Sequence, residues 1–422
     1  MTHRNTIIKN KSDMKKIINN RLSVIIVLLV TICAGTFFQA CEGNEEDMVM
    51  PEISYVRITA PVKSDSLVAH AYMGNNIAII GQNLGHVDEI WFNDQRAALN
   101  PNLVTNSSII VQVPQVIPTT VTNLMYLINS NKIDTLKYTF GVDVPAPQLD
   151  RLVCEYVETG GTAVIQGNFF VDNPGTPLQV FFPGNIEGTV ESISIDEIKV
   201  TVPDGVGAGP IQVKTIYGST RSSFYFRDDR NMVLNFDNLT AAGGWRSGVI
   251  GNSNPAPVSG NYVRFSGAMA GGAGTTWNED GFSFDLWPQA NGRPDAPFYT
   301  GEIKDAVIKF EVNVVAPWES AALQMIFTPY SITNSNSYIA DASVPRGLWM
   351  PWQATGTYKT DGWITVSFPL TDFNKTFDGA VCANKLTDAM LRGLTFFVWN
   401  GGVAGKACNP HICIDNIRVV PK

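Results

Sequence analysis

An internal repeat in the first half of the chain constrains its fold more than any other feature. Four segments recur in the same order about 90 residues further along. The pairs are NIAIIGQNL (76–84) with TAVIQGNFF (162–170), EIWF (89–92) with QVFF (179–182), SIIVQVP (108–114) with EIKVTVP (197–203), and TLKYTF (135–140) with SSFYF (222–226). Each segment alternates apolar and polar residues between Gly, Pro or Asn, as half-buried antiparallel strands do. We therefore predict two tandem β-sandwiches, over residues 53–142 and 146–227.

The remaining residues, 231–422, have a different character, because eight of the nine tryptophans lie there. They contain further strand-like runs and no sustained helical period. These runs are NYVRFSG (261–267), DAVIKFEVNVV (305–315), ALQMIFTPY (322–330), GWITVSFPL (362–370), LTFFVWN (394–400) and ICIDNIRVV (412–420). We predict a larger β-sandwich of the jelly-roll type, in which LNFDN (234–238) opens the domain beside CIDNIRVV (413–420). The whole chain is predicted to be all-β.

The N-terminus has the pattern of an export signal. Basic residues precede an apolar run, residues 22–38, and the small residue Ala40 precedes Cys41. A cysteine at the cleavage point resembles the signal of bacterial lipoproteins, in which this thiol is acylated. The acidic residues after it, within 41–52, also resemble the surface-export signal of Bacteroidetes lipoproteins. We expect residues 1–40 to be removed and residues 41–52 to tether the protein to outer-membrane lipid at the cell surface.

Composition narrows the classes of function. The net charge is −8 and no basic cluster follows Cys41, so nucleic acid is not an expected partner. Four further cysteines could form disulfides in an exported protein, but their spacing leaves the pairing open. They are Cys154, Cys382, Cys408 and Cys413. No motif typical of a metal centre or of a cofactor site occurs.

Aromatic residues beside Gly and Pro are the candidate binding residues. The segment RGLWMPWQATG (346–356) is predicted to be a loop that carries Trp349 and Trp352. Trp318 follows a proline at the end of a strand-like run. Large apolar rings on loops are tolerated when a sugar covers them, so we expect these three indoles to form a platform for a glycan. The alternative is that they pack as lids over the core edge. Secondary candidates are Tyr330, Trp287 and the guanidinium of Arg346.

Two resemblances to known families follow from these segments. The two repeats resemble IPT/TIG immunoglobulin-like domains, here acting as spacers. LNFDN, GWITVSFPLTDF (362–373) and CIDNIRVV resemble the C-terminal domain of Bacteroidetes surface glycan-binding proteins of the B type. This resemblance implies a lipoprotein that binds polysaccharide, most often a β-glucan such as xyloglucan or mixed-linkage glucan. It also implies that the glycan is held for nearby glycoside hydrolases and a SusC/SusD-like importer, without catalysis by this chain.

Two other functions remain open. A glycoside hydrolase needs two carboxylates across the cleaved bond, and five candidates occur in the last region. They are Glu279, Asp280, Asp285, Glu302 and Asp305. A protein-binding adhesin would instead spread its contact surface over the spacers. In any of these proteins, Asp237 and Asp415 could hold a structural calcium ion, although most carboxylates are merely solvated.

Overall fold

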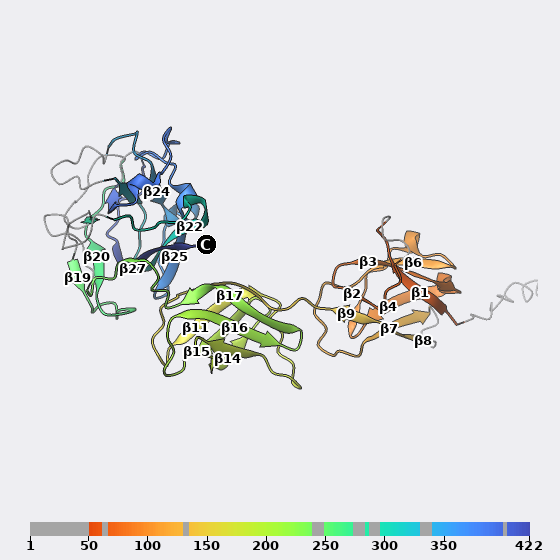
Figure 1. The fold of residues 1–422 in the computed structure, drawn as a ribbon. Helices are drawn as coiled ribbons and strands as arrows, with labels where there is room; N and C mark the ends of the chain where they lie inside the picture. The colour runs from red at the N-terminus through yellow and green to blue at the C-terminus, as the bar shows by residue number, and fades with distance from the viewer. Residues whose placement is uncertain are drawn as a thin grey trace, which may run out of the picture. The chain divides into compact units, whose positions relative to one another are not determined.

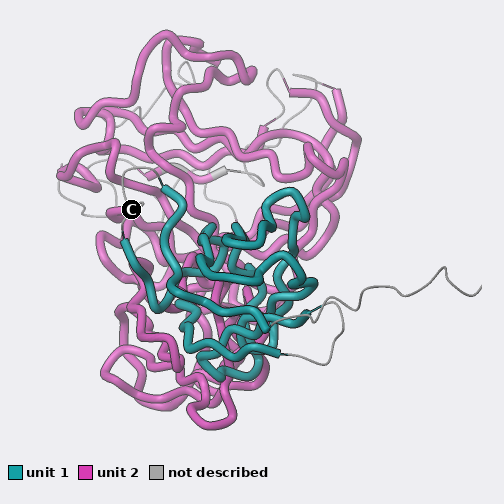
Figure 2. The backbone as a smooth tube through the Cα atoms, turned by 90° about the vertical axis from the view of Figure 1, so that its right-hand side faces the viewer, with its two compact units in different colours: residues 1–143 teal, residues 144–422 magenta. Residues whose placement is uncertain are grey.

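The protein is described by a computed structural model covering residues 50–60, 66–129, 135–238, 249–272, 283–286, 296–329, 340–399 and 403–422. The chain forms two compact units, residues 1–143 and 144–422, which are coloured separately in Figure 2. Strands dominate both units, and helical segments within the described ranges are short 3₁₀ turns. None of the helices in these ranges has the length and apolar character required to span a membrane.

The first unit is a β-sandwich around one apolar core (Figure 1). Its sheets have the orders β1-β3-β6 and β5-β4-β7-β8, and the short strands β2 and β9 pair in parallel. The bounds are β1 Glu52–Ile58, β2 His70–Tyr72, β3 Asn76–Gln82, β4 Val87–Phe92, β5 Gln95–Arg96, β6 Ser108–Gln112, β7 Leu124–Asn129, β8 Thr135–Thr139 and β9 Gly141–Asp143.

The second unit begins with a sandwich of matching topology. Its sheets have the orders β10-β11-β15-β14 and β13-β12-β16-β17, so the four repeated segments occupy equivalent strands in both copies. The bounds are β10 Gln148–Leu152, β11 Thr162–Asn168, β12 Gln179–Phe182, β13 Ile186–Glu187, β14 Thr189–Ile193, β15 Glu197–Thr201, β16 Gly209–Thr215 and β17 Gly218–Phe226. The prediction of two tandem immunoglobulin-like sandwiches is confirmed.

One glycine in each copy shows why the repeat recurs in this form. A Cβ atom on Gly81 would lie 1.8 Å from the carbonyl oxygen of Glu52, and one on Gly167 would lie 1.9 Å from that of Gln148. In each copy the edge strand, β1 or β10, has a register irregularity beside this glycine. The close approach of two backbones at a bulge therefore requires a residue without a side chain.

A larger β-sandwich completes the second unit. One sheet has the order β19-β20-β27-β22-β25, with β18 also paired to β27, and the other has the order β21-β26-β23-β24. The bounds are β18 Met232–Leu234, β19 Val249–Gly251, β20 Tyr262–Ser266, β21 Ser283–Leu286, β22 Ala306–Ala316, β23 Ala322–Thr328, β24 Arg346–Trp349, β25 Ile364–Pro369, β26 Gly393–Trp399 and β27 His411–Pro421. We call this part the C-terminal sandwich.

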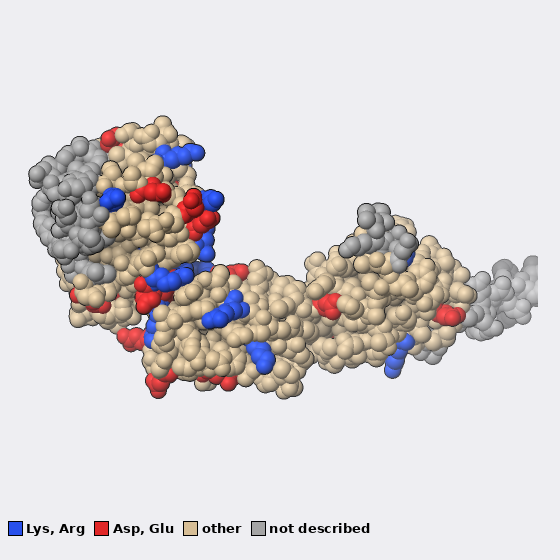
Figure 3. Space-filling view, viewed as in Figure 1, with Lys and Arg blue, Asp and Glu red and all other residues tan. Residues whose placement is uncertain are grey.

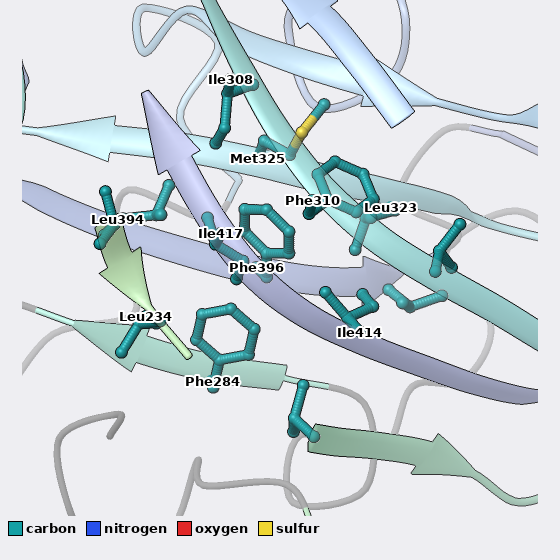
Figure 4. Close-up of a cluster of buried hydrophobic side chains, with 14 of the residues drawn as sticks. Leu234, Phe284, Ile308, Phe310, Leu323, Met325, Leu394, Phe396, Ile414 and Ile417 are labelled. Atoms are coloured by element: carbon teal, nitrogen blue, oxygen red, sulfur yellow. The ribbon is translucent and has the colours of Figure 1, made fainter. Parts of the chain in front are cut away.

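Both sheets contribute to the core of the C-terminal sandwich. Phe310 of β22 and Phe396 of β26 meet edge to face at 5.4 Å between ring centroids, and Phe284 stacks on Phe396 at 5.0 Å. Figure 4 shows these rings among aliphatic side chains from strands of both sheets. The predicted pairing of the opening and closing segments is also confirmed, because Leu234 lies opposite Ile417 in the β18–β27 ladder.

The prediction that residues 346–356 form a loop is wrong for the first four of these residues. Arg346–Trp349 forms the edge strand β24, which pairs with β23 from Ile326 to Leu323. The chain leaves the sheet after Trp349, and the 3₁₀ turn η7, Pro351–Ala354, follows. Gly347 lies inside this strand. Because it has no side chain, Met325 and two phenylalanine rings can pack about 3 Å from the position that its Cβ would occupy.

Candidate functional site

An aromatic cluster lies at the edge of the C-terminal sandwich. Trp318 and Trp349 meet edge to face at 5.6 Å, and Trp349 meets Tyr358 in the same way at 5.7 Å. The backbones of Trp318 and Tyr358 form a β-bridge with hydrogen bonds of 3.0 and 2.9 Å. We refer to Trp318, Trp349, Trp352 and Tyr358 as the edge cluster.

Two indoles of the edge cluster are buried, so the expectation that they stand exposed is wrong. Trp318 has 0% of its surface exposed, and its indole N–H donates to the carbonyl oxygen of Ser320. Trp352 is 7% exposed, and its N–H donates to the carbonyl oxygen of Ala321 at 2.7 Å. A buried indole needs a partner for its single donor, and main-chain carbonyls supply one here. These two rings therefore pack as lids over the core edge.

Arg346 is buried as well, which contradicts its expected role as an exposed donor to sugar hydroxyls. Its exposed fraction is 0%. The guanidinium donates to the side-chain oxygen of Gln324 at 2.8 Å and to the carbonyl oxygens of Asp341 and Val344 at 3.1 and 3.4 Å. Its planar donor fork thus holds the 341–344 segment against the four-stranded sheet.

Trp349 and Tyr358 are the half-buried residues of the edge cluster, and the ring of Trp349 also packs edge to face on the buried ring of Phe310 at 5.8 Å. Burial raises the pKa of Tyr358 above its usual value. Exposed residues 353–357 lie between the two rings in sequence. Their hydroxyl and amide groups place hydrogen-bonding partners beside an apolar surface, which is the combination that pyranose recognition needs.

Two further half-buried aromatic groups lie elsewhere on the C-terminal sandwich. Trp363 contacts Tyr262 edge to face at 5.3 Å and donates to the carbonyl oxygen of Ala256 at 2.8 Å. Trp399 stacks on Phe377 at 5.8 Å between ring centroids. Trp363 precedes strand β25 and Trp399 ends strand β26. Tyr358 and Phe377 were not candidates at all, because their position at a surface depends on tertiary pairing rather than on flanking residues.

Several expected residues lie outside the described part of the chain. They are Cys41, Glu279, Asp280, Trp287 and Tyr330. The side chain of Asp285 is likewise not described, whereas Glu302 and Asp305 are exposed. The binding roles of Trp287 and Tyr330 therefore stay predictions.

The two carboxylates considered for calcium are arranged around hydrogen-bond donors. Asp415 is buried and accepts from the hydroxyl of Ser259 at 3.1 Å, and burial raises its pKa to about 8. Asp237 accepts from the backbone N–H of Asn261 at 2.6 Å. Within the described ranges, no group of three or more His, Cys, Asp or Glu residues is placed to hold a metal ion.

The four cysteines of the described chain are free thiols. Cys154, Cys382 and Cys413 are buried, and Cys408 is half-buried. Burial raises the pKa of Cys413 to about 12 and keeps its thiol protonated. The disulfides considered from the sequence are therefore not formed.

Comparison with known proteins identifies a family for the C-terminal sandwich. Residues 226–421 match the family described as the surface glycan-binding protein B xyloglucan binding domain. The crystal structure of a surface glycan-binding protein B from Prevotella bryantii has a TM-score of 0.76 and 29% identity, over 88% of this chain and 99% of that one.

A Bacteroides ovatus protein described as IPT/TIG domain-containing is 33% identical over 161 residues, which is 37% of this chain. The match spans only 32% of that relative's own length. The description of this relative as IPT/TIG domain-containing agrees with the topology of the two repeated sandwiches. The family match covers the C-terminal sandwich that follows them. Residues 226–421, just under half of this chain, thus match the surface glycan-binding protein B family, and most of the chain shares the fold of a solved surface glycan-binding protein B.

Proposed function

We propose that the protein binds a β-glucan, with xyloglucan as the first candidate and mixed-linkage glucan as the second. The observation that carries this proposal is the match of the C-terminal sandwich to a xyloglucan binding domain. The glycan would lie on Trp349 and Tyr358 of the edge cluster, together with Trp287 and Tyr330.

The chemistry of a β-glucan suits such rings. A β-linked pyranose has axial C–H groups on its faces and hydroxyls around its rim, so an aromatic face covers the C–H surface while the rim stays hydrated. Each platform contributes about 1–2 kcal/mol by apolar area removed from water. A few platforms give a Kd of roughly 10–1000 μM after the cost of association. Rebinding along a polymer makes such weak sites sufficient.

The sparse charge of the chain fits a neutral ligand. Charged residues make up 16% of the chain, and on the face drawn in Figure 3 they are scattered over a mostly uncharged surface. A neutral glucan needs no concentrated charge, whereas nucleic acid requires clustered Lys and Arg. The cell-surface location of the family agrees with this chemistry.

The attachment and the partners are parts of the same proposal. Acylation of Cys41 would anchor the chain in the outer membrane, facing outward. The protein would then hold its glycan for neighbouring glycoside hydrolases and a SusC/SusD-like importer, and would not cleave it. The chain's relatives are described as glycan-binding proteins, which supports a role without catalysis.

Affinity electrophoresis on xyloglucan, mixed-linkage glucan and unrelated polysaccharides tests binding, with reducing-sugar release measured in parallel. We expect retardation by xyloglucan or mixed-linkage glucan and no release of sugar. Retardation by neither β-glucan would contradict the proposed ligand, and release of sugar would establish a hydrolase instead.

Substitution tests the position of the site. Trp349→Ala should weaken binding about 5–30-fold, the loss of roughly 1–2 kcal/mol of ring contact. Trp91→Ala is the matched control, because Trp91 is also half-buried but lies on β4 of the first sandwich. Circular dichroism confirms that both variants fold. If the two folded variants bind the glucan with equal affinity, Trp349 is not part of the binding site.

A further inference from the structure

The outer face of the six-stranded sheet is buried along its strands β22 and β27, although it points away from the core of the C-terminal sandwich. On β22, Ile308 and Phe310 face the core, while Lys309 and Glu311 point to the other side. Their exposed fractions are 8% and 0%, and that of Arg418 on the neighbouring strand β27 is 0%. Charged side chains are seldom buried without partners, so this face must be covered by a surface that pairs with them.

The covering surface comes from the second sandwich and presents Glu155. This residue is 3% exposed and lies in the connection between β10 and β11. One carboxylate oxygen of Glu155 accepts from Arg418 at 2.6 Å, and the other accepts from Lys309 at 2.5 Å. Arg418 also donates to both carboxylate oxygens of Glu311, at 2.8 and 3.0 Å. Two anions and two cations thus form one neutral cluster across the two sandwiches.

Backbone hydrogen bonds fix the same joint. The amide of Thr365 on β25 donates to the carbonyl oxygen of Val153 at 2.8 Å, and the hydroxyl of Thr365 accepts from the amide of Glu155 at 2.7 Å. That hydroxyl also donates to Glu311 at 2.8 Å. The chain that connects the sandwiches is held too, since the amide of Arg227 donates to the carbonyl oxygen of Glu155 at 2.7 Å.

The cluster depends on Glu155 for its charge balance. Burial by itself would lower the pKa of Arg418, but Glu311 and Glu155 outweigh burial and raise this pKa above its ordinary value. Without Glu155, Lys309 and Arg418 would share one carboxylate in a site that excludes water. An uncompensated buried charge is among the most destabilising changes in a protein.

We infer that the second sandwich is not an interchangeable spacer but the cap of the C-terminal sandwich, with Glu155 supplying an obligatory counter-ion for Lys309 and Arg418. The two sandwiches then unfold as one cooperative unit. The capped part of this sheet face is also closed to glycan, so ligand contacts belong to the remaining surfaces of the C-terminal sandwich. This inference does not depend on which polysaccharide binds.

Pulsed hydrogen exchange across a urea series, read by mass spectrometry on the mature full-length chain, tests the inference. Peptides from β16 report the second sandwich and peptides from β22 report the C-terminal sandwich. In the wild type we expect both to lose protection at the same urea concentration. In Glu155→Gln we expect β22 to lose protection first, with its unfolding equilibrium constant raised about a hundredfold or more. Glu158→Gln is the control, because Glu158 is exposed in the same connection.

Three results would overturn the inference. One is separate unfolding of β16 and β22 peptides in the wild type, and another is equal behaviour of Glu155→Gln and Glu158→Gln. If Glu155→Gln does not fold, the double variant Glu155→Gln/Lys309→Met tests the inference in its place. Removing the charge of Lys309 leaves Glu311 and Arg418 as a buried pair with no net charge. Recovery of folding supports the counter-ion role, whereas a double variant as impaired as the single one refutes it.

Discussion

Replacing Trp318 with phenylalanine should lower stability and leave glycan affinity unchanged. Trp318 is 0% exposed, and its N–H donates to the carbonyl oxygen of Ser320. Phenylalanine cannot donate this hydrogen bond, and an unpaired buried carbonyl costs about 1–3 kcal/mol. The smaller ring also leaves a cavity worth roughly 1–2 kcal/mol. The sum, about 2–5 kcal/mol, corresponds to a fall of roughly 4–20 °C in Tm for a domain of about 150–250 residues.

Scanning calorimetry and a glycan titration below Tm measure the two effects separately. We expect the Kd of Trp318→Phe to stay within about twofold of the wild type. A variant with the Tm of the wild type and greatly reduced affinity would refute the reasoning. That result would mean that the indole turns outward to meet sugar, as the sequence alone led us to expect.

Three other perturbations have defined outcomes. Gly167→Ala should cost about 1–3 kcal/mol or more in urea unfolding, because its Cβ would lie 1.9 Å from the carbonyl oxygen of Gln148; Gly207→Ala, at a site with no atom within 4 Å of the new Cβ, should be nearly neutral. Burial raises the pKa of Asp415 to about 8, so its protonated carboxyl group contributes fully to the free energy of unfolding below about pH 4. This contribution is lost as the pH rises through 8. Tm should therefore fall over that range in the wild type but less in Asp415→Asn, with no response to a calcium chelator; a large fall in Tm on chelation would instead establish a metal site. The mature chain, unfolded in urea without reductant, should give four reactive thiols from residues 154–413, and fewer would indicate disulfides.

Much of the fold followed from short-range pattern. Alternation between Gly, Pro and Asn located the repeated strands, because a half-buried strand must alternate to satisfy both of its faces. The same alternation located β22 and β27, although both faces of these strands are buried. The sequence does not show why their outer face carries Lys309 and Arg418, because the shared partner Glu155 lies more than 150 residues away.

The candidate site was harder to predict, because the exposure of an indole is a tertiary property. Pro and Gly around Trp352 correctly indicated irregular structure at residues 351–356, although not the strand before it, and turn chemistry does not determine which way a ring points. The N–H of this indole could find a carbonyl such as that of Ala321 only after β23 and β24 had paired. Tyr358 shows the converse, since its flanking residues gave no sign of the bridge to Trp318.

The ionic joint at Glu155 has a practical consequence for dissecting the molecule. A fragment that starts at residue 231, where the sequence alone separates the last region, would expose Arg418 and Lys309 to water and lose their acidic partner. Fragments intended for crystallisation or for ligand titration should instead start near Val144, at the boundary between the two compact units. Exchange of binding specificity between relatives would likewise require both sandwiches to be transplanted together.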